Sequence, residues 1–278
     1  MSQPNRYAVL GHPVKHSKSP WIHQQFAAQT GHTLSYEAIE LPVDGLAQGL
    51  QALRDAGLQG CNVTVPFKHQ AFDLASDPTP RARLAQACNT LWFDGERVYA
   101  DNTDGQGLMR DLAPHLPGPW PTLRVLLLGA GGAGAGVLGP LLEQSPREVQ
   151  LINRTESRAH ELCQRHAALA QRMGVVLHAA PLAGHGAAFD VIINASASSL
   201  SGAASPLDAR ALRAGRLAVD LMYGAAAEPF LQWAQQHQAQ PRDGLGMLVE
   251  QAALSYALWH GVAPAVAPVL QQLRHQLR

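Results

Sequence analysis

Lys68 is the first residue whose type and position indicate chemistry. It ends the stretch NVTVPFK (residues 62–68), in which polar and apolar residues alternate as in a short strand. Of the 21 lysine and arginine residues in the chain, only three are lysines. Lysine can release a proton in a suitable environment, whereas arginine cannot. Lys68 is therefore a candidate proton donor, and the alternative is an ordinary solvated surface lysine.

Asp104 is the second candidate, within the polar run Asp-Asn-Thr-Asp-Gly at residues 101–105. This run follows two predicted strands that flank Asp94-Gly95, a typical hairpin turn. Asp104 either caps the helix predicted from residue 106 or faces a ligand as a partner of the proton donor. The motif alone leaves both alternatives open.

Two hydroxyl groups and two lysines lie close together in residues 15–20, KHSKSP. Ser19 before Pro20 predicts the start of a helix over about residues 21–30, and a simple cap would account for Ser19. A helix N-terminus binds anions readily, and this one would bring together Ser17, Ser19, Lys15 and Lys18. The expected ligand is a small carboxylate.

A glycine-rich turn marks a dinucleotide site. Gly129, Gly131 and Gly134 satisfy G-x-G-x-x-G, after an apolar strand at 124–128 and before a predicted helix. This strand–turn–helix context is what the motif requires. Glycine there lets the backbone approach a pyrophosphate at the helix N-terminus.

The end of the next strand, at about residues 149–152, indicates which dinucleotide binds. An NAD site needs an acidic residue at that point, but here Asn153 and Arg154 follow, with Thr155 and Arg158 beyond them. Two guanidinium groups and a hydroxyl favour the 2′-phosphate of NADP. The alternative is a solvated helix start that happens to carry arginines.

The elements that position these residues alternate between strand and helix. Such alternation predicts βαβ units, a parallel sheet and an α/β fold. Four prolines in residues 114–121 indicate a linker. A C-terminal helix that is apolar nearly all round, reaching about residue 260, is expected to be buried, so the Gln251 amide needs a hydrogen-bonding partner.

Composition limits the classes of function. The 278 residues suggest two domains, and 46% hydrophobic with 15% charged residues is typical of a globular chain. Net charge is zero, so nucleic acid is not expected as a partner. No signal peptide or membrane span is expected. The three cysteines are far apart, which predicts no metal site and a reducing compartment.

Together these motifs resemble shikimate dehydrogenase, the NADP-dependent enzyme family of aromatic amino-acid biosynthesis. Seven motifs carry the resemblance, in order and from end to end: residues 16–20, 62–68, 89–90, 102–105, 129–133, 153–155, and 243–247 with Gln251. The resemblance implies a Rossmann-type NADP-binding domain at 104–246. It also implies a discontinuous α/β substrate-binding domain at 1–103 and 247–278.

The resemblance further implies reversible NADPH-dependent reduction of 3-dehydroshikimate to shikimate. Its implied catalytic pair is Lys68, which moves the proton, and Asp104, which orients it. Its implied substrate-binding residues are Ser17 and Ser19 for the carboxylate, with Thr64, Lys68, Asn89, Asp104, Tyr223 and Gln251 for the rest of the molecule. Its implied NADP-binding residues are Gly129, Ala130, Gly131, Gly132, Ala133, Asn153, Arg154, Thr155, Arg158, Ser196, Leu221 and Gly244. Ser196 lies in Asn-Ala-Ser-Ala, where the family commonly has Asn-Ala-Thr-Ser.

Two alternatives stay open. The first is a quinate/shikimate dehydrogenase with wider substrate and cofactor use, against which Arg154 argues. The second is a catalytically silent NADPH-binding sensor, which loss of Lys68 or Asp104 would have favoured. We expect a cytoplasmic protein, monomer or homodimer, whose partner is a small-molecule substrate.

Overall fold

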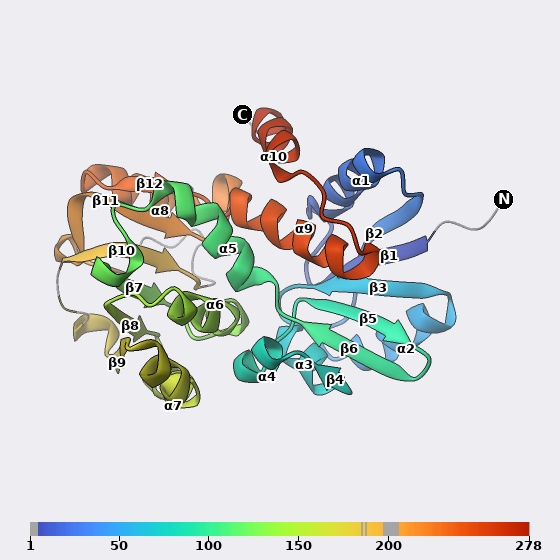
Figure 1. The fold of residues 1–278 in the computed structure, drawn as a ribbon, viewed down its shortest axis with the longest axis horizontal. Helices are drawn as coiled ribbons and strands as arrows, with labels where there is room; N and C mark the ends of the chain where they lie inside the picture. Colours follow the sequence, from blue (N-terminus) through green and yellow to red (C-terminus); the bar gives the residue numbers. More distant parts are fainter. Residues whose placement is uncertain (1–4, 185, 187, 197–205, 278) are drawn as a thin grey trace. The chain divides into compact units, whose positions relative to one another are not determined.

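The computed structural model describes residues 5–184, 186, 188–196 and 206–277. The chain forms two compact units (Figure 1). Unit 1 comprises residues 1–107 and 248–278, and unit 2 comprises residues 108–247. The chain leaves unit 1 within helix α5 (Asp104–Leu112) and returns within helix α9 (Leu245–His260). Unit 1 is therefore discontinuous in sequence.

Unit 1 is built on a six-stranded mixed sheet with the order β2-β1-β3-β5-β6-β4. The strands are β1 (Asn5–Gly11), β2 (Leu34–Glu40), β3 (Leu58–Val63), β4 (Asp77–Pro78), β5 (Thr90–Asp94) and β6 (Arg97–Asp101). β1 pairs in parallel with β2 and β3, whereas β5 is antiparallel to both β3 and β6. The hairpin predicted around Asp94-Gly95 is confirmed as β5 and β6.

Helices cover both faces of this sheet. They are α1 (Ser19–Thr30), α2 (Leu46–Asp55), α3 (Lys68–Asp73), α4 (Pro80–Ala85), the second part of α9, and α10 (Val266–Gln276). Helix α1 begins with Pro20 in its first turn and ends at Gly31, whose φ of 74° is in the left-handed region that glycine adopts easily.

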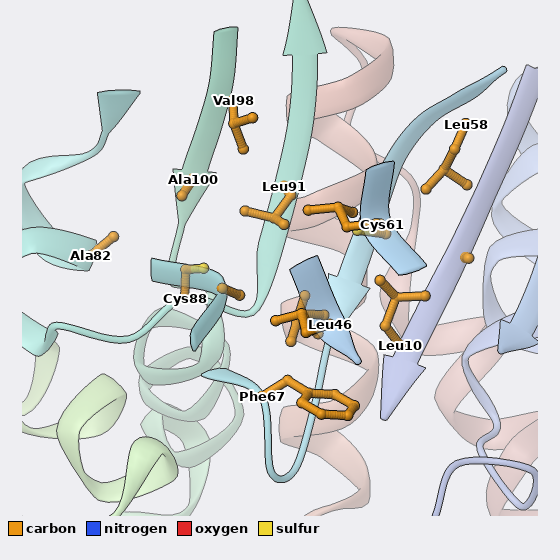
Figure 2. Packing of buried hydrophobic residues seen from close by; sticks show 14 residues of the cluster. Leu10, Leu46, Leu58, Cys61, Phe67, Ala82, Cys88, Leu91, Val98 and Ala100 are labelled. Atoms are coloured by element: carbon orange, nitrogen blue, oxygen red, sulfur yellow. The ribbon is translucent and has the colours of Figure 1, made fainter. Parts of the chain in front are cut away.

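Side chains alternate along β1 between two apolar cores, as the two-residue period of a strand requires. Ala8 and Leu10 pack with residues of α2, α3 and α4 in the core shown in Figure 2. Tyr7 and Val9 face the opposite side, where Trp259 of α9 covers them. β1 is thus buried on both faces and forms the centre of unit 1.

Unit 2 is built on an all-parallel sheet with the order β12-β11-β10-β7-β8-β9. Its strands are β7 (Arg124–Leu128), β8 (Glu148–Ile152), β9 (Val176–Ala180), β10 (Phe189–Asn194), β11 (Leu212–Asp220) and β12 (Gln240–Arg242). Counted from β7, this is the 3-2-1-4-5-6 order of the Rossmann fold, with its switch point between β7 and β10. The predicted α/β class and Rossmann-type fold are confirmed.

In addition to the end of α5 and the start of α9, the described part of unit 2 contains three further helices. They are α6 (Gly132–Glu143), α7 (Glu156–Met173) and α8 (Glu228–Gln236). Short 3-10 turns lie at Ala113–His115, Trp120–Thr122, Leu182–Gly184, Ala209–Ala211 and Gly224–Ala226. The core of this unit includes Leu126, Phe189, Ile192 and Phe230.

The unit 1 sheet is mixed, because it combines the predicted parallel strands with the predicted β5–β6 hairpin. Two expectations from the sequence were wrong. The prolines at 114–121 lie inside unit 2 and do not separate the units, since the chain changes units within helices α5 and α9. The strand expected within residues 62–68 ends at Val63, because the chain turns there and the amide of Phe67 donates to the carbonyl of Thr64, 2.9 Å away.

Candidate active site

Lys68 and Asp104 form a direct ion pair in unit 1. Lys68 is the first residue of α3 and Asp104 is the first residue of α5. The distance from Lys68 Nζ to Asp104 Oδ2 is 2.5 Å, and the two side chains are only 13% and 7% exposed. Burial removes water from both charges, so each depends on the other and on neighbouring hydrogen bonds. The Asp104 carboxylate is thus engaged as a partner of Lys68.

Asn89 and Gln251 complete the surroundings of Asp104. Asn89 Nδ2 lies 2.9 Å from Asp104 Oδ1 and 3.0 Å from Gln251 Oε1. Gln251 Nε2 donates to the carbonyl of Leu248, one turn earlier in α9. The partner expected for the Gln251 amide is therefore found within the protein. All four side chains belong to unit 1.

The serine-containing loop and the strand before Lys68 are neighbours. β1 and β3 are adjacent and parallel, so their carboxyl ends lie at the same edge of the sheet. Beyond these ends, the amide of Thr64 donates to the carbonyl of Leu10, and the amide of His12 donates to that of Val65. The loop that follows β1 therefore begins next to the segment that carries Thr64 and Lys68.

Ser17 lies in that loop, and Ser19 begins helix α1 directly after it. Lys18 is the N-cap residue of α1 and makes no side-chain cap, so Ser19 is the first helical residue and not the cap suggested by the sequence. Ser17 Oγ accepts from the Ser19 amide at 3.2 Å. Ser19 is buried, Ser17 and Thr64 are half-buried, and Lys15 is exposed.

The glycine-rich turn of unit 2 follows β7 at the switch point of the sheet. Gly129 has φ 112°, and a Cβ there would lie 2.9 Å from the backbone of Ala195. A Cβ on Gly134 would lie 2.0 Å from the Gly129 carbonyl oxygen, so both positions require glycine for packing. A Cβ on Gly131, by contrast, would meet no protein atom within 4 Å. Protein packing does not explain Gly131, whereas close approach by a pyrophosphate does.

The residues after β8 connect to this turn. Asn153 Oδ1 accepts from the amide of Ala130 at 3.1 Å, and Asn153 Nδ2 donates to the carbonyl of Thr155. Gly132 and Ala133 are the first two residues of α6. Arg154 and Arg158 are exposed and form no ion pair within the part of the chain that the structure describes. The residues of unit 2 fit an NADP molecule with its pyrophosphate at α6 and its 2′-phosphate near these arginines.

The ends of β10 and β11 carry the remaining predicted cofactor residues. Ser196 Oγ and its amide both bond to Asn194 Oδ1, at 2.7 Å and 3.1 Å. A Cβ on Gly244 would lie 2.1 Å from the Leu221 carbonyl oxygen, so these two backbones are in contact and glycine is required. Tyr223, half-buried, follows β11 in unit 2. Ala197 lies outside the described residues.

Several buried residues around this site were not predicted from the sequence. Asp101 is fully buried, and its carboxylate accepts bonds from Thr79, Arg81 and the amide of Asn102. It ties α4 to the loop that leads to Asp104. The Thr79-Pro80 pair was the available signal, because it is a helix-start pattern and Thr79 does cap α4.

No group of three or more metal-binding side chains is present among the described residues. Within the same residues, no helix is long and apolar enough to cross a membrane. Cys61, Cys88 and Cys163 carry free thiols, and burial raises the pKa of the Cys163 thiol to about 11.

Comparisons with known proteins agree with this geometry. Three family models match successive parts of the chain: the shikimate dehydrogenase substrate binding domain at residues 9–91, shikimate / quinate 5-dehydrogenase at 111–221, and the shikimate 5'-dehydrogenase C-terminal domain at 244–274. The shikimate dehydrogenase (NADP(+)) of Acidovorax sp. (strain JS42) is 55% identical over 96% of this chain and 95% of its own length. That of Paracidovorax citrulli (strain AAC00-1) is 53% identical over 99% of both chains.

Solved structures give the same relationship. Shikimate 5-dehydrogenase from Thermus thermophilus, in complex with shikimate, is 35% identical and has a TM-score of 0.80 over 98% of this chain and 99% of that one. Identity above half over nearly the full length of both chains leaves no other assignment: the chain belongs to the shikimate dehydrogenase family.

Proposed function

We propose that Lys68 and Asp104 are the catalytic pair of an NADP-dependent shikimate dehydrogenase, the activity that family membership assigns to this chain. The buried contact of 2.5 Å between them is the observation that carries this assignment. The reaction is the reversible reduction of 3-dehydroshikimate to shikimate. When bound, NADPH supplies the hydride that adds to the ketone carbon.

Reduction of the ketone also needs a proton, which a protein side chain supplies. As the carbonyl carbon accepts the hydride, its oxygen gains negative charge and takes a proton from the Lys68 ammonium. In the reverse direction the neutral amine of Lys68 accepts the proton of the shikimate hydroxyl and becomes the ammonium. Asp104 Oδ2 holds Nζ in place and compensates the positive charge of the ammonium form.

The remaining polar groups of unit 1 orient the substrate. Ser17 and Ser19 bind its carboxylate, as the hydroxyls near the start of α1 suggest. Thr64, Asn89 and Gln251 bind its ring hydroxyls, and Tyr223 is the further substrate-binding residue that the family resemblance implies. The crystal structure of shikimate 5-dehydrogenase from Thermus thermophilus in complex with NADP(H) and shikimate, 33% identical to this chain, supports a site for both ligands.

The residues of unit 2 hold NADP. The backbone of residues 129–133 approaches the pyrophosphate, Asn153, Arg154, Thr155 and Arg158 surround the adenosine 2′-phosphate, and Ser196, Leu221 and Gly244 lie at the nicotinamide end. We also propose that units 1 and 2 correspond to the substrate-binding and NADP-binding domains, whose expected boundaries at 103/104 and 246/247 lie within four residues of the unit boundaries at 107/108 and 247/248. We further propose that the protein is cytoplasmic and a monomer or homodimer. Light scattering of the purified protein tests the last point.

A quinate/shikimate dehydrogenase is the second candidate, because one matching family model is described as shikimate / quinate 5-dehydrogenase. The test is an assay of the wild-type protein with shikimate and quinate, each with NADP and NAD, following reduced cofactor by its absorbance. Activity confined to shikimate with NADP is expected. Comparable rates with quinate or with NAD would favour the second candidate. NADP binding without turnover of either substrate would indicate the silent sensor.

A further inference from the structure

We propose that Thr90 is a positioning residue for catalysis. Its hydroxyl holds the side-chain amide of Asn89 in the one orientation that donates a hydrogen bond to Asp104. The proposal rests on the function proposed above, in which Asp104 works with Lys68. Thr90 itself is the first residue of β5 and is fully buried.

The hydrogen bonds of Asn89 show how the orientation is set. Asn89 Oδ1 accepts from Thr90 Oγ1 at 2.9 Å and from the backbone amide of Thr103 at 2.8 Å. Asn89 Nδ2 lies within 3.0 Å of three acceptors, Thr103 Oγ1, Asp104 Oδ1 and Gln251 Oε1. The oxygen end of the amide therefore meets donors, and the nitrogen end meets acceptors.

Rotation of this amide by half a turn would disturb both ends. It would place Asn89 Oδ1 against the carboxylate of Asp104 and would direct Nδ2 at the amide of Thr103, which can only donate. Two side-chain hydroxyls reach Oδ1, that of Thr90 at 2.9 Å and that of Thr103 at 3.2 Å. Thr103 Oγ1 has a second acceptor, the carbonyl of Gln251 at 3.1 Å, so Thr90 is the closer side-chain donor and the one that a substitution tests.

The neighbours of Thr90 hold its hydroxyl in turn. Asn62 Nδ2 lies 3.2 Å from Thr90 Oγ1, and Ser255 Oγ lies 2.7 Å from it. With Asn62 and Ser255 able to donate to its oxygen, the hydroxyl hydrogen of Thr90 is left for Asn89 Oδ1. Ser255 makes no hydrogen bond to Asn89 within the part of the chain that the structure describes, so it provides a matched control in the same network.

Three variants test the role. Thr90→Val keeps the side-chain shape and removes the hydroxyl, whereas Thr90→Ser keeps the hydroxyl. Ser255→Ala removes a buried hydroxyl without touching Asn89. We expect Thr90→Val to lower kcat about tenfold, with a smaller change in the KM for shikimate. Thr90→Ser and Ser255→Ala should stay within about threefold of the wild-type kcat. NADP titration confirms that each variant is folded.

Two results would overturn the proposal. One is a Thr90→Val kcat within about threefold of wild type. The other is a loss in Ser255→Ala as large as in Thr90→Val, which would indicate that any damage to the network has the same effect. Wild-type protein inactive on shikimate would instead contradict the proposed function. A crystal structure of Thr90→Val tests the inference even in that case. The inference requires the Asn89 amide to rotate or to move away from Asp104 in this variant. An unchanged contact of 2.9 Å between Asn89 Nδ2 and Asp104 Oδ1 would contradict the inference.

Discussion

The two six-stranded sheets of this protein bury their polar side chains in different ways. Among the described residues, 11 of the buried polar or charged side chains lie in unit 1 and 6 in unit 2. Those of unit 2 include side-chain pairs such as Asn194 with Asp220 and Asp111 with Arg242. Those of unit 1 include one connected network, which links Asn62, Asn89, Thr90, Thr103, Asp104, Gln251 and Ser255.

This difference is in keeping with the ligand that we propose for each unit. NADP presents phosphates that backbone amides and exposed guanidinium groups can bind, so a Rossmann unit needs few buried polar side chains for it. A small hydroxylated acid must be positioned by side chains that are themselves held in place. In such a network the loss of one member acts mainly on the groups bonded directly to it. Substitutions of the groups that bond to Asn89 or Asp104 should therefore affect turnover, those at the proposed carboxylate site should affect the KM for shikimate, and those in unit 2 should affect cofactor affinity.

The strongest test of this contrast is Lys68. Lys68→Ala should lower kcat by about 10²–10⁴-fold, because it removes a positioned acid–base group. Lys68→Arg keeps the charge but cannot exchange a proton near neutral pH, so it should bind shikimate and still turn over poorly. Steady-state kinetics measure both variants, with unchanged NADP binding as the control for folding. An Arg variant that keeps more than about a tenth of the wild-type kcat would assign proton transfer to another group.

The corresponding test in unit 2 is the pair of exposed arginines. Replacing Arg154 and Arg158 with Gln should raise the KM for NADP at least about tenfold, because each charge-assisted bond contributes ~1.5–3 kcal/mol. The kcat at saturating NADP should change little. Arg172→Gln, in the last turn of the same helix α7, is the matched control. An unchanged preference for NADP over NAD in the double variant would refute the assignment.

A smaller effect is expected at the proposed carboxylate site. Replacing Ser17 and Ser19 with Ala should raise the KM for shikimate by roughly three- to tenfold, the loss of about one net hydrogen bond. The dissociation constant of NADP should stay the same, because unit 2 holds the cofactor. Ser35→Ala, which removes a half-buried hydroxyl in the same unit, is the control. If NADP affinity falls as much as shikimate affinity, the two serines have a structural role.

The smallest effect at neutral pH concerns stability, at His23 of α1. Its ring is fully buried and stacks on Tyr36 at 4.2 Å, and neither ring nitrogen has a hydrogen-bond partner among the described residues. Burial, with a smaller contribution from the charge of His260, lowers the pKa of His23 from 6.5 to about 3. The unfolded chain therefore takes up this proton first, and stability is lost as the pH falls from 6.5 towards 3.

The loss due to His23 should reach about 2 kcal/mol at pH ~5. His23→Phe should reduce the pH dependence of the unfolding free energy by this amount, measured by urea denaturation at several pH values. Replacing His275, which is exposed on α10, should leave that dependence unchanged. Equal pH dependence in wild type and His23→Phe would show that His23 is not the group that titrates.

Much of the local structure follows from the sequence. The hairpin around Asp94-Gly95 and the strand–turn–helix at Gly129 depend on residues close together in the chain, and both are confirmed. Turn residues and two-residue periodicity act over a few positions, so sequence reasoning finds them. The linker predicted from the prolines at 114–121 was wrong, because proline content indicates a break in secondary structure but does not indicate which contacts the segment makes.

The sequence alone indicated the candidate groups: a scarce lysine after a strand, an aspartate after a hairpin, and arginines where an NAD site would have an acid. How these groups meet depends on contacts between distant parts of the chain. Asn89 contacts Gln251 across 162 positions because α9 returns to unit 1, and no local pattern encodes that return. Nor does the sequence show which donors meet the Asn89 amide, since the orientation of a buried amide is set by non-local partners around it.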